Sequence, residues 1–257
     1  MYRVPGYPKE EGRAVFRWPP VRGYTEYFQY YAKEYVHDRK GTEHDIILKA
    51  DDDIVWLNAT EIRPFAEYFW NHPEIWLLSA AVVNQGLVVH YQQQQCGAVP
   101  KELFGELPLP DNGMGTWHDN ATQALQIHQY FLSSQEARDK FYCQEGPVFH
   151  PFSFTINVNF VALRRKDFPE YMQLTQEKLI AEKRYYDEGT MTWDAIKKRS
   201  KVEGIYMKLV VSHGTFGAQD AVTQAVLEEY VKYGKRERSD LYGTLLDDYN
   251  YSAFERK

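Results

Sequence analysis

Short apolar runs alternate with amphipathic stretches along this chain. The runs Ile46–Ala50, 75–83 and 207–211 are typical of buried strands, and 154–163 alternates apolar and polar positions in its first part. Apolar residues at helical spacing predict helices over 59–70, 120–134, 169–184 and 219–233. This alternation predicts an α/β fold with a mixed sheet flanked by helices.

The remaining segments set the expected domain organisation. Residues 1–23 are rich in Pro, Gly and charge and predict an irregular N-terminal segment. Residues 96–119 hold most of the mid-chain Pro and Gly and predict a long connection. Residues 235–257 form a charged tail that we expect at the periphery. We therefore expect one domain over 1–257.

The clearest chemical feature is a carboxylate triplet, Asp51, Asp52 and Asp53, between the runs Ile46–Ala50 and Ile54–Leu57. Adjacent carboxylates repel one another and are costly to desolvate unless a cation compensates them. At the end of a buried strand, a divalent metal shared with substrate phosphates is the favoured compensation. The alternative is a solvated acidic turn before a helix capped at Asn58 or Thr60.

Overall composition limits the partners and the compartment. A net charge of -6 and a pI near 5.8 argue against nucleic acid or an anionic membrane as partner. No apolar run reaches the length of a membrane span, and the N-terminus lacks a signal-peptide core. The compartment stays open, with the cytoplasm favoured. Cys96 and Cys143 exclude a disulfide framework, but their spacing does not decide whether they form one bridge.

The order of several motifs resembles a family. The apolar-Lys-x-Asp-Asp-Asp strand is followed by Leu-Ser-Ala-x-Val-Val-Asn at 78–84, and a helix spans 117–132. Ile-Asn-Val-Asn at 156–159, Asp187-Glu188 and Val-Ser-His-x-x-Phe at 211–216 complete the set. Over residues 24–225 this order is similar to nucleotide-sugar-dependent glycosyltransferases of the GT-A fold, in a branch found in fungi and some large viruses.

The resemblance implies roles around the donor. Asp51–Asp53 takes the place of the DxD motif, and Asp51 and Asp53, two positions apart, point to one side. They hold a metal that bridges the diphosphate, while Asp52 is aimed elsewhere, toward the ribose. His213 completes the metal sphere, with a hydrogen-bonded strand-end histidine as the alternative. An imidazole among oxygen ligands favours Mn²⁺ over Mg²⁺.

The resemblance also implies roles around the acceptor. One of Asp187 and Glu188 serves as general base for the acceptor hydroxyl, which makes the transfer inverting. The alternative is a pair of surface acids in a turn. Asn157 and Asn159 line the acceptor cleft or form cross-strand hydrogen bonds. The cationic run 164–166 is interpreted as a solvated loop rather than a phosphate contact.

The expected function is transfer of a sugar from a nucleoside-diphosphate sugar to a glycan or glycoconjugate hydroxyl. Family members place about a hundred residues of nucleotide-binding chain before this motif. Only about half that length precedes Asp51, so we expect either that the sequence begins partway through the nucleotide-binding half or that this half is shortened. Two alternatives stay open: a non-catalytic carbohydrate-binding or interaction protein on this scaffold, and a magnesium-dependent nucleotidyltransferase or phosphohydrolase.

Overall fold

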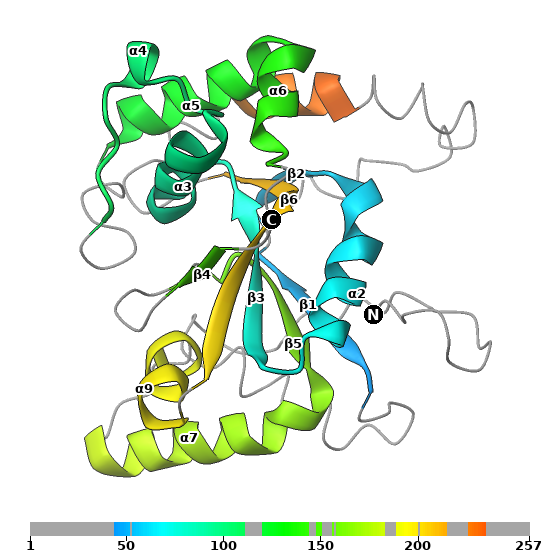
Figure 1. The fold of residues 1–257 in the computed structure, drawn as a ribbon, viewed down its shortest axis with the longest axis vertical. Helices are drawn as coiled ribbons and strands as arrows, with labels where there is room; N and C mark the ends of the chain where they lie inside the picture. The colour runs from blue at the N-terminus through cyan, green and yellow to red at the C-terminus, as the bar shows by residue number, and fades with distance from the viewer. Residues whose placement is uncertain are drawn as a thin grey trace, which may run out of the picture.

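A computed structural model describes residues 44–51, 53–110, 120–143, 148–150, 156, 158–182, 189–199, 201–214 and 226–234. One mixed sheet forms its centre, with helices around it (Figure 1). The predicted α/β class is therefore confirmed. The predicted irregular segment 1–23 and charged tail 235–257 lie outside the described residues.

The sheet has six strands in the order β1-β5-β3-β6-β2, with β4 also paired to β6. Their bounds are β1 Ile46–Ala50, β2 Ile54–Leu57, β3 Ile75–Val82, β4 Val148–His150, β5 Phe160–Arg164 and β6 Val202–His213. β3 and β6 are parallel, and β5 is antiparallel to both β1 and β3. β1, β3 and β6 thus run the same way, so their carboxyl ends share one edge of the sheet.

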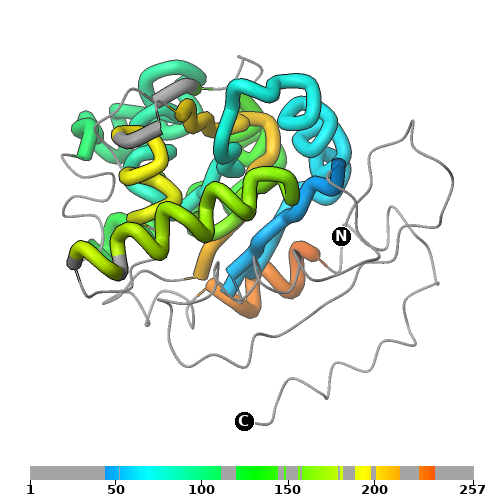
Figure 2. The backbone as a smooth tube through the Cα atoms, turned by 90° about the horizontal axis from the view of Figure 1, so that it is seen from below, coloured from blue at the N-terminus to red at the C-terminus, as the bar shows by residue number. Residues whose placement is uncertain are grey.

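Helices surround this sheet at both ends and along its length. The helical segments are η1 Ala59–Glu61, α2 Ile62–Asn71, α3 Gly86–Cys96, α4 Lys101–Phe104, α5 Ala121–Ser133, α6 Gln135–Phe141, η3 Arg165–Asp167, α7 Phe168–Glu182, η4 Thr190–Asp194, α9 Ala195–Arg199 and a helix over 226–234. α7 lies across the end of the molecule opposite α5 and α6 (Figures 1 and 2). Among the described residues, no helix is both long and apolar enough to cross a membrane.

The core occupies both faces of the sheet. On one face, Phe65 and Phe69 of α2 lie among buried residues of β3, β5 and β6. On the other, Phe131 of α5 and Tyr171 of α7 belong to a larger buried cluster. Each face needs an apolar helix stripe to cover it, because the central strand β3 is buried along its whole length.

The periodic elements form where the sequence predicts them. β1 and α5 match the predictions closely, β3 ends one residue early, and α7 covers 168–182 against a predicted 169–184. β6 is longer than predicted, since it already begins at Val202. Of the predicted helix over 219–233, residues 226–233 are described and are helical.

The predicted strand over 154–163 is wrong in its first part. Ile156 and Val158 are described and lie outside regular structure, and β5 begins only at Phe160. The carbonyl oxygens of Val158 and Asn159 instead accept hydrogen bonds from Lys49 Nζ and Asp51 N, both at 2.8 Å. The Asp51–Asn159 backbone bond continues the β1–β5 pairing by one position, but residues 156 and 158 are not part of a strand.

α3 was not predicted because its pattern is not amphipathic. Gln92 and Gln93 occupy its buried side, where apolar residues are expected in a helix of this kind. Gln93 is satisfied there, since its amide donates to Gly105 O and accepts from Leu107 N, both at 2.8 Å. Gln85 caps the helix start, and Gly97 ends it in the left-handed region at φ 60°.

The interpretation of the cationic run 164–166 as a solvated loop is wrong for two of its members. Arg164 and Arg165 are buried, at 3% and 9% exposure. The Arg164 guanidinium donates to the carbonyls of Phe69, His72 and Ile75, which end α2 and begin β3. A buried arginine is stable here because these carbonyls replace its water.

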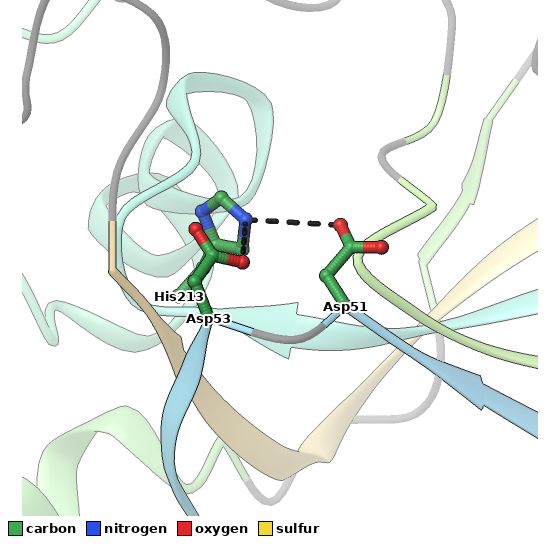
Figure 3. Close-up of side chains that lie close together, drawn as sticks. All are labelled: Asp51, Asp53 and His213. Carbon is green, nitrogen blue, oxygen red and sulfur yellow. Dashed lines mark ion pairs between the residues drawn. The ribbon is translucent and has the colours of Figure 1, made fainter. Parts of the chain in front are cut away.

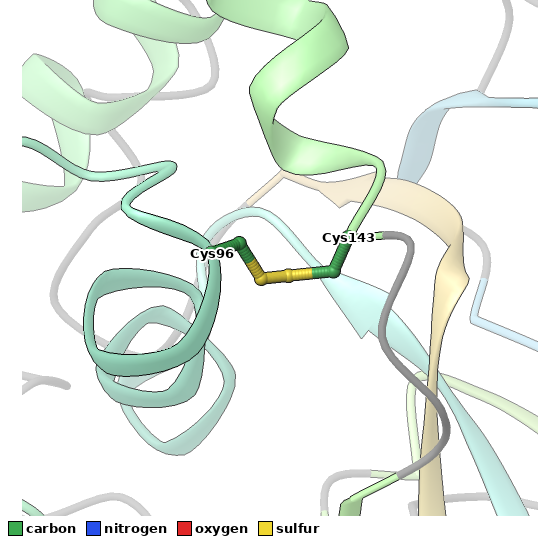
Figure 4. Close-up of a disulfide and its surroundings, with 2 residues drawn as sticks. All are labelled: Cys96 and Cys143. Atoms are coloured by element: carbon green, nitrogen blue, oxygen red, sulfur yellow. A yellow bond between two sulfur atoms is a disulfide. The ribbon is translucent and has the colours of Figure 1, made fainter.

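Cys96 and Cys143 form a disulfide, which the spacing alone left open (Figure 4). It joins the last residue of α3 to the chain just after α6. The two Cα atoms lie 5.6 Å apart across 47 positions of sequence. The bridge therefore closes a long loop that contains α4, α5 and α6, the helices at the sheet's carboxyl end (Figure 1).

Removing this bridge should lower stability by about 2–4 kcal/mol, because a long loop regains its freedom in the unfolded chain. Thermal unfolding of the wild type with and without a thiol reductant measures the effect. The matched control is the Cys96→Ser/Cys143→Ser double variant. Its thermal unfolding midpoint should be the same with and without the reductant. Two titratable thiols in the unfolded, non-reduced wild type would contradict the prediction.

Candidate metal centre

Three predicted ligands meet at the carboxyl edge of the sheet. Asp51 follows β1, and His213 is the last residue of β6. Asp53 directly precedes β2, whose first residue Ile54 pairs with His213. The acid turn therefore links β1, at one edge of the strand order, to β2 at the other, and it does so beside the end of β6 (Figure 3).

The side chains of this cluster point toward one another (Figure 3). His213 Nε2 lies 2.9 Å from Asp53 Oδ1 and 3.7 Å from Asp51 Oδ2. One ligand atom from each residue can be chosen so that all lie within 4.8 Å of one another. The His213 side chain is 6% exposed, whereas those of Asp51 and Asp53 are 25% and 34% exposed. The imidazole thus forms the floor of the cluster and the carboxylates its open side.

Neighbouring groups fix both acids. The Asp51 carboxylate accepts from Asn159 Nδ2 at 2.6 Å and from Lys49 Nζ. Its backbone N–H donates to Asn159 O at 2.8 Å, so Asn159 holds Asp51 at two points. Asp53 is held through its carbonyl oxygen, which accepts from Gly214 N at 2.8 Å. The ligand geometry is consequently set by backbone pairing as well as by side chains.

The donor set suits a small divalent cation. Two ligand atoms that each lie about 2.1 Å from a metal, at a right angle, are about 3 Å apart. The Asp53–His213 separation of 2.9 Å is close to that value. Two carboxylates and one imidazole are donors that Mn²⁺ accepts, with positions left for substrate oxygens. The three residues therefore fit the predicted metal.

Lys49 changes the charge balance that we expected. A metal was predicted as the compensation for the acids, yet Lys49 forms an ion pair with Asp51 and is only 10% exposed. Lys49 stands two positions before Asp51 on an extended strand, so both side chains fall on one face. That spacing was the available signal for the pair. Lys49 offsets the charge of one of the two carboxylates.

A buried neutral network lies behind His213. Ser212 Oγ donates to the Tyr230 hydroxyl at 2.9 Å, and that hydroxyl lies 2.8 Å from His128 Nδ1. Burial, together with the nearby His213, lowers the pKa of His128 to about 3. Burial also raises the pKa of Tyr230. Both groups therefore stay uncharged near neutral pH, and they tie α5 and the helix over 226–234 to the end of β6.

The other predicted site residues stay predictions. Asp52, Asn157, Asp187 and Glu188 lie outside the described residues. For Asn159, the contact with Asp51 supports the hydrogen-bonding alternative rather than a place in an acceptor cleft. Asp51, Asp53 and His213 are thus the predicted site residues that the structure brings together.

Comparisons with models of known protein families, with curated proteins and with solved structures found no match to this chain.

The wild-type protein should bind Mn²⁺ in the absence of nucleotide, as measured by calorimetry or by the electron paramagnetic resonance of free Mn²⁺. Asp53→Asn and His213→Gln should each weaken binding more than about tenfold, because each removes a ligand. Asn159→Ala should weaken it by about 10- to 100-fold, since such supporting partners orient the ligands.

Glu67→Gln is the matched control, because Glu67 forms an exposed ion pair with Arg63 on α2 and is not a member of the cluster. Its Mn²⁺ affinity should equal that of the wild type. Mn²⁺ affinities that Asp53→Asn and His213→Gln leave unchanged would show that the cluster holds no cation.

Proposed function

We propose that this protein is a metal-dependent glycosyltransferase that moves a sugar from a nucleoside-diphosphate sugar to a hydroxyl of a glycan or glycoconjugate. The observation that carries the proposal is the convergence of Asp51, Asp53 and His213 at the carboxyl edge of a mixed sheet. Ligands of open α/β sheets bind at this edge. A GT-A-like arrangement of the sheet and helices is part of the proposal.

Each residue has a defined task in this scheme. Asp51 and Asp53 would hold the cation with their carboxylates, and His213 would hold it with its imidazole. The bound metal would neutralise charge that builds on the departing diphosphate. Asn159 holds Asp51 in position. Lys49 adds a fixed positive charge beside the site, which favours the anionic leaving group.

The acceptor side rests on the resemblance alone. Asp187 or Glu188 accepts the proton of the attacking hydroxyl, which adds to the anomeric carbon from the face opposite the leaving diphosphate. The sugar–oxygen bond to the diphosphate breaks as the new glycosidic bond forms. This single displacement inverts the configuration of the anomeric carbon.

The disulfide provides an indication of the cellular compartment in which the protein is found. Disulfides persist in oxidising compartments and are rare in the reducing cytosol. The bridge between Cys96 and Cys143 therefore favours a lumenal or extracellular setting over the cytoplasmic one that composition favoured.

UDP or GDP should bind tightly only when Mn²⁺ is present, because the metal joins the acids to the diphosphate. Isothermal titration with each nucleotide, with Mn²⁺ and with a chelator, measures this. Asp53→Asn should abolish the metal-dependent part while thermal unfolding stays near the wild type. Equal affinity for the nucleotides in Mn²⁺ and in chelator would contradict the proposal.

Asp187→Asn or Glu188→Gln should slow sugar transfer about 100-fold or more, because the acceptor loses its base. Nucleotide binding in the same variant should stay at the wild-type level, which separates catalysis from donor binding. The two single variants are compared with each other, because only the acid that acts as the base should give the large loss of transfer rate. Unchanged transfer rates in both single variants would exclude this pair as the base.

The Lys49–Asp51 ion pair favours a second candidate, a non-catalytic carbohydrate-binding protein. In that case the Lys49 ammonium contacts Asp51 and the His213 imidazole contacts Asp53, and no metal takes part. The Mn²⁺ titration distinguishes the two, since only the glycosyltransferase requires the cation.

A further inference from the structure

A second concave site lies away from the metal centre, between β2, α2, α6 and β6. It is a hollow of about 390 Å³ that is open on one side. Six residues line it: Asn58, Glu61, Pro64, Tyr142, Tyr206 and Lys208. Its volume falls in the range of about 300–1,000 Å³ that is typical of small-molecule sites.

The hollow and the metal centre are connected by the same two strands. Asn58 follows Asp53 by five positions through β2, and Lys208 precedes His213 by five positions in β6. At about 3.3 Å per residue, each path spans at most roughly 16 Å. None of Asp51, Asp53 and His213 lines the hollow. The hollow is therefore a separate site, on the same rigid part of the sheet.

Two side chains of opposite charge line this hollow without forming an ion pair with each other. Lys208 and Glu61 are both half-buried. Within the described part of the chain, neither side chain forms an ion pair or a hydrogen bond. Half-buried charges of this kind gain from a polar ligand that can both accept from an ammonium and donate to a carboxylate.

The remaining wall combines hydroxyl, amide and apolar groups. Burial and the neighbouring Glu61 carboxylate raise the pKa of Tyr206, so its hydroxyl stays protonated. Asn58 Oδ1 accepts from Thr60 Oγ1 at 2.7 Å, which fixes the amide. Pro64 and the Tyr142 ring add apolar surface of the kind that covers the C–H faces of a sugar.

These features discriminate among ligand classes. A phosphate or nucleotide would meet the Glu61 carboxylate, which repels it. A purely apolar ligand would remove water from Lys208 and Glu61 without forming hydrogen bonds to replace it. A neutral polyol carries hydroxyls that donate to Glu61 and accept from Lys208, together with C–H faces that contact rings.

We propose that the hollow is a metal-independent binding subsite for a small neutral saccharide. Its hydroxyls donate to Glu61 and accept from Lys208 and Asn58, and Pro64 and Tyr142 contact its ring faces. This role goes beyond sugar transfer at the metal centre and does not depend on it, because neither the cation nor the donor takes part.

The test is titration of the full chain, in EDTA, with a panel of di- and trisaccharides of common neutral hexoses and N-acetylhexosamines. At least one member should bind the wild type. Lys208→Met and Glu61→Gln should each weaken that binding about tenfold or more, because each removes a hydrogen bond to a charged group. Lys101→Met and Glu106→Gln, from an exposed ion pair elsewhere, should leave it unchanged.

Protection of the wild-type chain provides a second measurement that needs no variant. The bound saccharide should slow acetylation of Lys208 several-fold and leave that of Lys101 unaffected. This readout holds even where Lys208→Met or Glu61→Gln fails to fold.

Saccharide binding by the Asp53→Asn variant tests this proposal independently of the proposed glycosyltransferase function. Saccharide binding that persists in Asp53→Asn supports the hollow, whatever the outcome of the Mn²⁺ and nucleotide titrations. Binding that disappears in Asp53→Asn, or that survives in folded Lys208→Met and Glu61→Gln, would overturn it. So would a panel in which no member binds the wild type.

Discussion

The compensation of negative charge at the carboxyl edge of the sheet is the constraint on which the site depends. Asp51 and Asp53 approach one imidazole, and carboxylates at such spacing repel each other in a partly buried setting. Lys49 and Asn159 offset Asp51 from one side, and His213 faces Asp53 from the other. The divalent cation that we propose would complete this compensation at the carboxyl edge of the sheet.

The surrounding scaffold is built to keep this edge rigid. The neutral Ser212–Tyr230–His128 network anchors the end of β6 without adding a competing charge. The disulfide from Cys96 to Cys143 encloses the helices over the same end of the sheet. The two concave features also differ in chemistry: like charges cluster at the metal centre, whereas opposite charges line the hollow. A cation suits the first and a neutral polyol the second.

Much of the fold was predictable because it follows local periodicity. β1 begins with Ile46 and Ile47, which are buried on opposite faces of the sheet, and α5 buries one helix face. A continuous apolar run and a helical stripe can both be seen in sequence alone. α3 was missed because Gln93 is buried and satisfied by distant backbone groups of Gly105 and Leu107. Arg164 was misassigned for the same reason, since its carbonyl partners come from segments about 90 positions away.

For the site, the sequence by itself determined the ligand types and the strand ends on which they lie. Asp51 and Asp53 follow one buried run and His213 another, and this pattern was enough to predict a metal site. Only the tertiary structure decided that these ends meet, that Lys49 shares the charge of Asp51, and that Asn159 supports it. The reason is physical: periodicity reports which face of an element is buried, whereas contacts between remote side chains depend on strand order and register.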